Sequence, residues 1–139
     1  MPASCWYTGI RPPTLLFFRI MIVEKPWGTY EVLLDVPDKG YKVKRIVVNP
    51  YERFSLQYHN HREEHWVIVE GCGQIHIGGR DHTGDVGSHW VIKQKQIHRA
   101  TAGVDGLIFI ETQTGDCREE DIVRLQDDYG RLDSSEVSQ

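Results

Sequence analysis

Four side chains with the chemistry of metal ligands are spaced so that a fold can bring them together. Gln57 and His59 are two residues apart, so on a β-strand both side chains leave the same face. Glu64 follows a polar turn and opens an apolar run, and His98 lies further along the chain. A carboxamide oxygen, two imidazoles and a carboxylate suit a borderline divalent metal with open positions for a substrate. We therefore predict that these four residues bind one metal ion.

A further histidine lies beside this group. His61 has the same strand parity as Gln57 and His59, so it is an alternative ligand. It is also a candidate acid–base group lining the pocket, because an unperturbed imidazole titrates near neutral pH. An exposed turn histidine is the third interpretation. His65 directly follows Glu64 and is expected to face the opposite side of its strand.

Length and composition indicate one ordinary globular domain. The chain has 139 residues, of which 40% are hydrophobic and 26% are charged. A net charge of −4 gives no electrostatic footprint for nucleic acid or an anionic membrane. The three cysteines are an odd number without a CxxC pair, which is typical of free thiols in a reducing cytoplasm. We therefore expect a cytoplasmic protein with neither nucleic-acid nor membrane partners.

Short runs rich in Val, Ile, Tyr and Trp, separated by Gly, Pro and Asn turns, predict a succession of β-strands. We expect strands at residues 29–34, 41–49, 53–59, 64–70, 74–77, 87–92, 97–101 and 107–112. About eight strands without a long helix indicate a sandwich or a closed barrel. The one candidate helix follows Asp116, which forms a possible capping box with Glu119. An extended segment wrapping the barrel is the alternative there.

The two ends of the chain differ from this patterned region. Residues 1–20 form an apolar leader interrupted by Arg19, too short for a membrane span and without the features of a secretory signal. Patterning begins at Met21, which is a candidate functional start. We therefore expect a leader over residues 1–20, one domain over 21–131 and a flexible tail over 132–139.

The ligand spacing resembles the motif pair of the cupin superfamily. In the first motif two ligands lie two apart, a carboxylate follows after four intervening residues, and a glycine closes the hairpin; Gln57, His59, Glu64 and Gly71 fit this pattern. His98 takes the place of the histidine of the second motif. The sequence departs from the family at three turn positions. These are Tyr51 and Lys95, where glycine is usual, and Lys93, where proline is usual.

Five sequence blocks resemble one cupin family more closely, the type II mannose-6-phosphate isomerase domain that is often fused behind a mannose-1-phosphate guanylyltransferase. The blocks occupy residues 25–33, 41–48, 54–66, 98–99 and 121–131. The resemblance implies an all-β cupin double-stranded β-helix (a jelly-roll barrel) with at most one short C-terminal helix. It also implies that one divalent ion, of zinc, manganese, cobalt, nickel or iron, supports interconversion of mannose 6-phosphate and fructose 6-phosphate. No counterpart of the nucleotidyltransferase half is present in this sequence, so guanylyl transfer is not implied.

A sugar phosphate also requires cations and a proton-transfer group. Lys42 and Lys44 share one strand face, and a lysine pointing into a barrel is costly unless it meets an anion. We therefore expect Lys44 to bind phosphate or to act as an acid–base group, with His61 as the other proton-transfer candidate. Arg99 directly follows His98, and a guanidinium suits phosphate binding or a catalytic contact.

Arg124 and Arg131 lie in the matching C-terminal block and are the remaining candidate phosphate ligands. The competing interpretation pairs them with the neighbouring acidic residues. Two other functions stay open from the sequence: a non-catalytic cupin that binds a sugar or sugar nucleotide, and an iron-dependent redox cupin such as a dioxygenase. Because cupins commonly pair, we also expect a homodimer.

Overall fold

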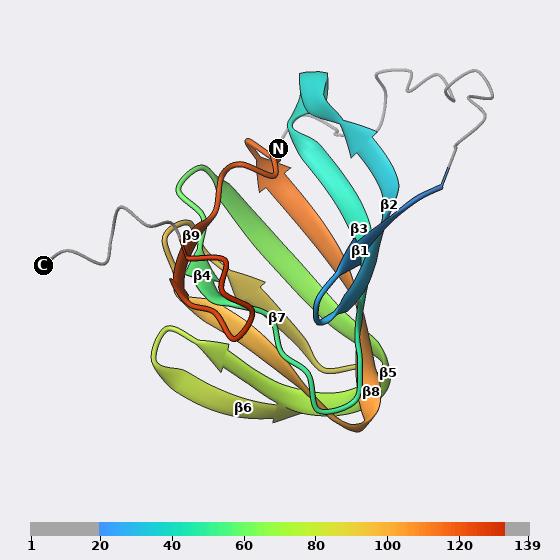
Figure 1. Ribbon diagram of the computed structural model, residues 1–139. Coiled ribbons are helices and arrows are strands. Elements are labelled where there is room, and N and C mark those ends of the chain that lie inside the picture. The colour runs from blue at the N-terminus through green and yellow to red at the C-terminus, as the bar shows by residue number, and fades with distance from the viewer. Residues whose placement is uncertain (1–19, 133–139) are drawn as a thin grey trace, which may run out of the picture.

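The computed structural model describes residues 20–132, which form nine β-strands and one short 3-10 helix (Figure 1). The expected leader, apart from residue 20, and the expected tail, apart from residue 132, lie outside the described residues. The strands are β1 (Met21–Lys25), β2 (Gly28–Val36), β3 (Tyr41–Val48), β4 (Leu56–Tyr58), β5 (Arg62–Ile77), β6 (Arg80–Gly84), β7 (His89–Ile92), β8 (His98–Gly115) and β9 (Val123–Gln126). The 3-10 helix is η1 (Pro37–Lys39). The predicted all-β class is therefore confirmed.

One continuous antiparallel sheet curls into two layers because two of its strands are long enough to run through both. The first layer follows the order β1-β2-β3-β8-β5-β7 and uses the C-terminal half of β8 and the N-terminal half of β5. The second follows β6-β5-β8-β4-β9 and uses the remaining halves of the same two strands. This is the predicted double-stranded barrel (Figure 1).

Glycines let the two long strands bend, where the sequence analysis expected turns between separate strands. The register of β5 with β8 shifts between Gly71 and Gly73. Gly71 has a φ of 76°, and a Cβ added there would approach the carbonyl oxygen of Gly106 to 2.1 Å. Only a glycine fits this left-handed close approach without displacing the backbone. The predicted strands at 64–70 and 74–77 are therefore one bent strand, and those at 97–101 and 107–112 are another.

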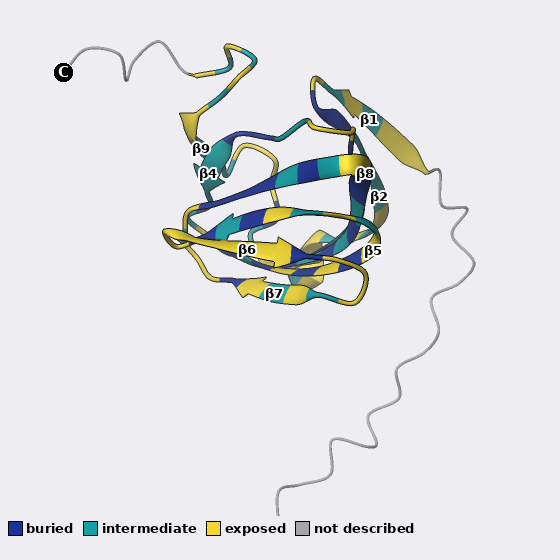
Figure 2. Ribbon diagram, turned by 90° about the horizontal axis from the view of Figure 1, so that it is seen from below, coloured by how far each residue is buried: buried dark blue, intermediate teal, exposed yellow. Residues whose placement is uncertain are grey.

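The core lies between the two layers and is built by strand alternation. Figure 2 shows buried and exposed bands alternating along β5 and β8. In β3 the buried side chains include Lys42, Lys44 and Ile46, while Arg45 lies on the other face, as strand parity predicted. Trp66 and Phe109 are the largest fully buried side chains, and their ring centroids lie 4.6 Å apart.

The segment after Asp116 is extended, so of the two alternatives the helix is not formed. Its expected capping pair is used elsewhere, because Asp116 binds the guanidinium of Arg118 at 2.6 Å and Glu119 binds Lys44. β9 then pairs with β4 and closes one edge of the second layer. Within residues 20–132 no helix is long and apolar enough to span a membrane.

The two turn positions where the sequence lacks the usual glycines are left-handed. Tyr51 has a φ of 61° and Lys95 a φ of 62°. A non-glycine residue in this region costs roughly 1–2 kcal/mol because Cβ crowds the carbonyl oxygen. The backbone N–H of Lys95 donates to the carbonyl of His59 at 2.7 Å, so this strained turn adjoins the predicted ligands.

Candidate metal centre

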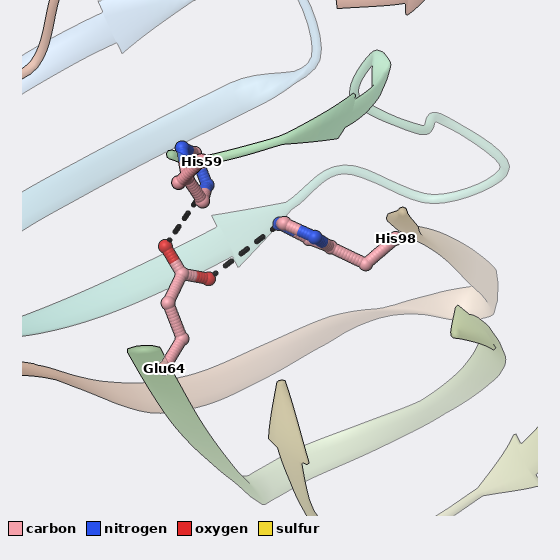
Figure 3. Close-up of side chains that lie close together, drawn as sticks. All are labelled: His59, Glu64 and His98. Atoms are coloured by element: carbon pink, nitrogen blue, oxygen red, sulfur yellow. Dashed lines mark ion pairs between the residues drawn. The ribbon is translucent and has the colours of Figure 1, made fainter. Parts of the chain in front are cut away.

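Three of the four predicted ligands meet at one end of the barrel interior. His59 follows β4, Glu64 lies in β5 and His98 begins β8, and all three are almost fully buried. Nε2 of His59 lies 3.1 Å from Oε1 of Glu64, and Nε2 of His98 lies 3.6 Å from Oε2 of the same carboxylate. Figure 3 shows Glu64 between the two imidazoles. Strands far apart in sequence therefore converge on one point.

Backbone carbonyls fix the tautomer of both histidines. Nδ1 of His59 lies 2.6 Å from the carbonyl oxygen of Asp121, and Nδ1 of His98 lies 2.8 Å from that of Gln96. A carbonyl oxygen only accepts hydrogen bonds, so each Nδ1 carries the proton. Each Nε2 therefore presents its lone pair towards Glu64, which is the arrangement a metal ligand needs.

The geometry fits a metal ion. One ligand atom from each of His59, Glu64 and His98 can be chosen so that all lie within 4.8 Å of one another. Nε2 of His98 is buried and makes no hydrogen bond, an arrangement that costs free energy unless another group satisfies it. Imidazole and carboxylate ligands suit zinc, manganese, cobalt, nickel and iron alike. The cluster is therefore a candidate divalent-metal site.

Gln57, the fourth predicted ligand, lies beside this cluster and pairs in register with His98. Its Oε1 accepts a hydrogen bond from the Ser55 hydroxyl at 2.6 Å, whereas its Nε2 lies 3.5 Å from Nε2 of His59. An amide nitrogen is no metal ligand. Rotating the amide by half a turn presents the oxygen instead, and the Ser55 hydroxyl can then accept from the nitrogen.

Two residues that the sequence analysis did not single out hold Glu64 in place. The guanidinium of Arg62 donates to Oε1 of Glu64 at 3.1 Å, and the indole of Trp66 donates to Oε2 at 3.0 Å. Burial by itself raises the pKa of Glu64, but its close contacts with His59 and His98 and the positive charge of Arg62 lower it below its usual value. Arg62 and Trp66 have the strand parity of Glu64, which is the signal that identifies them.

Glu111 is a second buried carboxylate, and it shares the Trp66 indole with Glu64. The indole of Trp66 also donates to it, at 3.1 Å, and the Gln113 amide donates at 2.5 Å. Burial, followed by the charge of Glu64, raises the pKa of Glu111 to about 7. Its partner across the sheet is Lys44, an expected inward-facing cation, and this register places it in the same interior.

Lys44 is buried, as expected, and it meets an anion from the chain itself. Its Nζ lies 2.5 Å from Oε1 of Glu119, on the segment between β8 and β9, and 4.1 Å from the centroid of the Tyr30 ring. Lys42 reaches the same carboxylate oxygen at 3.5 Å and the carbonyl of Cys117 at 2.8 Å. The sequence analysis placed Glu119 in a helix cap and so missed this contact.

A cavity opens beside the metal cluster and is lined on one side by cations. Lys25, Lys44, Arg124 and Arg131 line it together with Gln57 and Glu64. Burial, opposed by Glu119 and reinforced by the charges of Arg124, Arg131 and Lys44, lowers the pKa of Lys25. The structure therefore brings three predicted cations together and adds Lys25, whose place in the first matching sequence block was its only signal.

Arg99 and His61, both predicted site residues, lie away from this cavity. Arg99 is buried on the opposite face of β8 from His98, where its guanidinium donates to the carbonyls of Phe54 at 3.0 Å and Gln126 at 3.3 Å. Strand alternation separates it from its neighbour, so its contacts hold β9 against the barrel instead of reaching the candidate site. Arg131 lines the cavity but also binds the Asp127 carboxylate at 2.7 Å, as the competing interpretation expected.

His61 lies in the turn between β4 and β5 with an exposed side chain. Its backbone N–H donates to the carboxylate of Asp121 at 2.9 Å. His61 follows the end of β4, so the strand parity that predicted a shared face with Gln57 and His59 no longer applies. The structure therefore brings His61 neither to the metal cluster nor to the lining of the cavity.

Comparison with known proteins identifies relatives of this arrangement. The alginate biosynthesis protein AlgA of Pseudomonas aeruginosa is 40% identical over 113 residues, covering 78% of this chain and 23% of that protein. A mannose-1-phosphate guanylyltransferase of Escherichia coli is 36% identical over 111 residues, with the same two coverages. The chain thus spans about a quarter of the length of the curated relatives that it matches.

Solved structures of lower identity share the fold. An RmlC-like cupin from Shewanella frigidimarina superposes with a TM-score of 0.64 at 17% identity, covering 79% of this chain and 96% of that one. The KdgF structure from Halomonas gives a TM-score of 0.65 at 13% identity, covering 72% and 89%. The predicted cupin fold is therefore confirmed. Residues 19–127 match a family described as "Mannose-6-phosphate isomerase C-terminal", and with this match the chain belongs to that cupin family.

Proposed function

We propose that this chain is a metal-dependent aldose–ketose isomerase that interconverts mannose 6-phosphate and fructose 6-phosphate. The observation that carries the proposal is a single cavity lined both by Glu64 of the candidate metal cluster and by four cations, Lys25, Lys44, Arg124 and Arg131. Metal-ligand chemistry and an anion-binding surface are the two recognition elements that a sugar phosphate needs. Membership in the mannose-6-phosphate isomerase C-terminal family supports the same substrate.

The reaction moves a proton between the first two sugar carbons through an enediol. His59, Glu64 and His98 would hold the metal, and Gln57 would join them once its amide oxygen faces the cluster. The bound metal supplies Lewis-acid stabilisation of the negative charge that develops on the sugar oxygens. The hydrogen bonds from Arg62 and Trp66 keep the Glu64 carboxylate ionised and oriented, so the ligand set is preorganised.

The phosphate group would bind Lys25, Arg124 and Arg131, which line the same cavity as Glu64. Burial first, and then the charges of Arg124 and Arg131, lower the pKa of Lys25, so an anion placed among these three cations would offset both effects. Aromatic side chains of Trp27, Tyr30 and Phe54 line the same cavity. Their apolar surface excludes water and strengthens the electrostatic interactions within.

The test is a coupled isomerase assay on the full chain, measuring fructose 6-phosphate formed from mannose 6-phosphate. The protein is first stripped with a chelator and then supplied separately with zinc, manganese, cobalt, nickel or iron. We expect turnover to disappear on stripping and to return with at least one metal. His98→Ala should abolish the restored turnover, whereas the control His82→Ala changes an exposed histidine outside the cluster and should leave it intact.

Two other outcomes would redirect the assignment. A folded protein that binds metal and mannose 6-phosphate but gives no turnover with any metal would indicate a non-catalytic sugar-binding cupin. Oxygen consumption with iron and a candidate substrate would indicate a redox cupin, since the same ligand types serve iron oxygenases.

A further inference from the structure

Glu119 is placed differently from every other acidic residue near the cavity. It lies on the segment that connects β8 to β9, and its side chain is 47% exposed, yet it lines the same cavity as Glu64. Its Oε1 contacts Nζ of Lys44 at 2.5 Å. Burial and then the charge of Glu119 raise the pKa of the neighbouring Tyr30 phenol to about 12. The Glu119 carboxylate therefore influences another side chain that lines the cavity.

The other two carboxylates that line the cavity, Glu64 and Glu111, already accept hydrogen bonds from buried side chains. Both oxygens of Glu64 face the imidazoles and accept from Arg62 and Trp66. Both oxygens of Glu111 accept hydrogen bonds deep in the barrel, from Trp66 and Gln113. Among the described residues, three carboxylates line this cavity, and Glu119 is the one of them that contacts the ammonium groups of Lys42 and Lys44.

We propose that Glu119 is the base that transfers the proton between C1 and C2 of the open-chain sugar, with the Lys44 ammonium as its acid partner. This assignment rests on the proposed function. It replaces His61, whose exposed side chain does not line the cavity. Lys44 keeps the acid–base role expected from the sequence, now with a specific companion.

The step balances within these two side chains. Glu119 takes the C2 proton of the aldose, the C–H electron pair forms the C1=C2 bond, and the carbonyl pair moves to O1, which takes a proton from Lys44. The resulting enediol then loses the O2 proton to the Lys44 amine, C2=O forms, and C1 recovers the proton held by Glu119. Both side chains end in their starting protonation states.

The environment of Glu119 suits this role. Burial by itself raises the pKa of Glu119, but the charge and hydrogen bond of Lys44 and the charge of Lys42 lower it below its usual value. The carboxylate is therefore ionised at neutral pH, which is the form that a general base needs, and it becomes a stronger base when Lys44 gives up its proton to the sugar oxygen.

The first experiment compares Glu119→Gln with Glu120→Gln in the full chain carrying the activating metal. Glu120 is the adjacent exposed acid and does not line the cavity, so it is a matched control. We expect Glu119→Gln to lower kcat roughly 10²–10⁴-fold, with KM and metal content unchanged. Incorporation of deuterium from heavy water into the sugar should fall with it, and Glu120→Gln should behave as wild type.

A second variant separates a catalytic role from a structural one. Glu119→Ala removes the carboxylate and leaves space, so added formate should restore part of the lost turnover and deuterium incorporation. Failure of rescue, together with lost metal or a lowered urea midpoint, would overturn the assignment in favour of a structural tie.

The failure of this inference differs from the failure of the proposed function. Normal turnover and deuterium incorporation in Glu119→Gln would overturn the role of Glu119 and leave the isomerase assignment standing. A wild-type protein that binds metal and mannose 6-phosphate without turnover or deuterium incorporation would overturn both.

Discussion

The carbonyl oxygen of Asp121 lies 2.6 Å from Nδ1 of His59 and so sets which imidazole nitrogen is free to bind a metal. The carboxylate of Asp121 also accepts the backbone N–H groups of Asn60 and His61, both at 2.9 Å. One residue of the C-terminal segment therefore positions both the ring and the turn of a candidate ligand. This makes the segment part of the candidate metal centre although it supplies none of the predicted ligands.

We expect Asp121→Ala to weaken metal binding by roughly 10–100-fold, the usual effect of losing an outer-shell partner. The variant frees two backbone N–H groups and loosens the segment that carries the carbonyl. Competition with a chromophoric chelator measures the dissociation constant. Glu120→Ala is the control on the same segment. An equal loss of metal affinity in that variant would show that the effect is not specific to Asp121.

Glu64→Gln should weaken metal binding by more than the roughly 100-fold expected for an outer-shell change. The amide keeps the shape of the carboxylate but removes the negative charge between the two imidazoles. Glu63→Gln is the control, because Glu63 is only partly buried and its carboxylate pairs with Lys93 at 3.3 Å, outside the cluster. Metal content after dialysis distinguishes the two variants, and equal retention would contradict the ligand assignment.

The metal-free protein should lose stability in acid as His98 gains a proton. Burial lowers the pKa of His98 from 6.5 to about 4, despite the opposing charge of Glu64. Between these two values the unfolded chain binds more protons than the folded one, so the free energy of unfolding falls as pH decreases from about 6.5 towards 4. Glu111, with a raised pKa of about 7, contributes the opposite slope between its ordinary value and neutrality.

Urea titrations of the stripped protein at several pH values measure this dependence, with His98→Gln to isolate the His98 contribution. The wild-type midpoint should fall more steeply between pH 6.5 and 4 than that of the variant. Parallel curves would contradict a lowered pKa. The imidazole signal of His98 in an NMR titration gives the pKa directly.

Lys95→Gly should stabilise the protein by about 1 kcal/mol, because a glycine removes the Cβ crowding of a left-handed residue. The φ of Lys95 is 62°, its side chain is exposed, and the change restores the residue usual in the family. Gln94→Gly, at an exposed neighbour without a positive φ, gains no such relief and should be neutral or destabilising. Urea unfolding measures both, and a destabilised Lys95→Gly would contradict the strain.

Arg99→Met should reduce stability by about 2 kcal/mol, since the buried carbonyls of Phe54 and Gln126 lose their donor. Metal affinity and the KM for the sugar phosphate should change little, because Arg99 does not line the cavity. Arg124→Met, at a cavity-lining arginine, should instead raise KM. A large rise in KM for Arg99→Met would restore the original expectation of a phosphate contact.

The sequence by itself predicted the barrel and the three residues that meet in the candidate metal cluster, because strand alternation and ligand spacing are local patterns. Strand alternation places Lys44 inside and Arg45 outside whatever the neighbouring strands do. Ligand spacing likewise identified His59, Glu64 and His98. Strand alternation predicts side-chain direction only within a strand. His61 lies in the turn after β4, so the prediction that it shares a face with Gln57 and His59 was wrong.

Only the tertiary structure decided which distant residues complete the site. Lys25, Glu111 and Glu119 come from three separate parts of the chain and line one cavity. They meet because β1, β2, β3 and β8 pair side by side and the segment before β9 contacts β3 through Glu119 and Lys44. Strand alternation already separates Arg99 from His98, but the partners that Arg99 binds are set by where β9 docks against β4. Long-range register, which no local pattern encodes, fixed the composition of the cavity and these contacts.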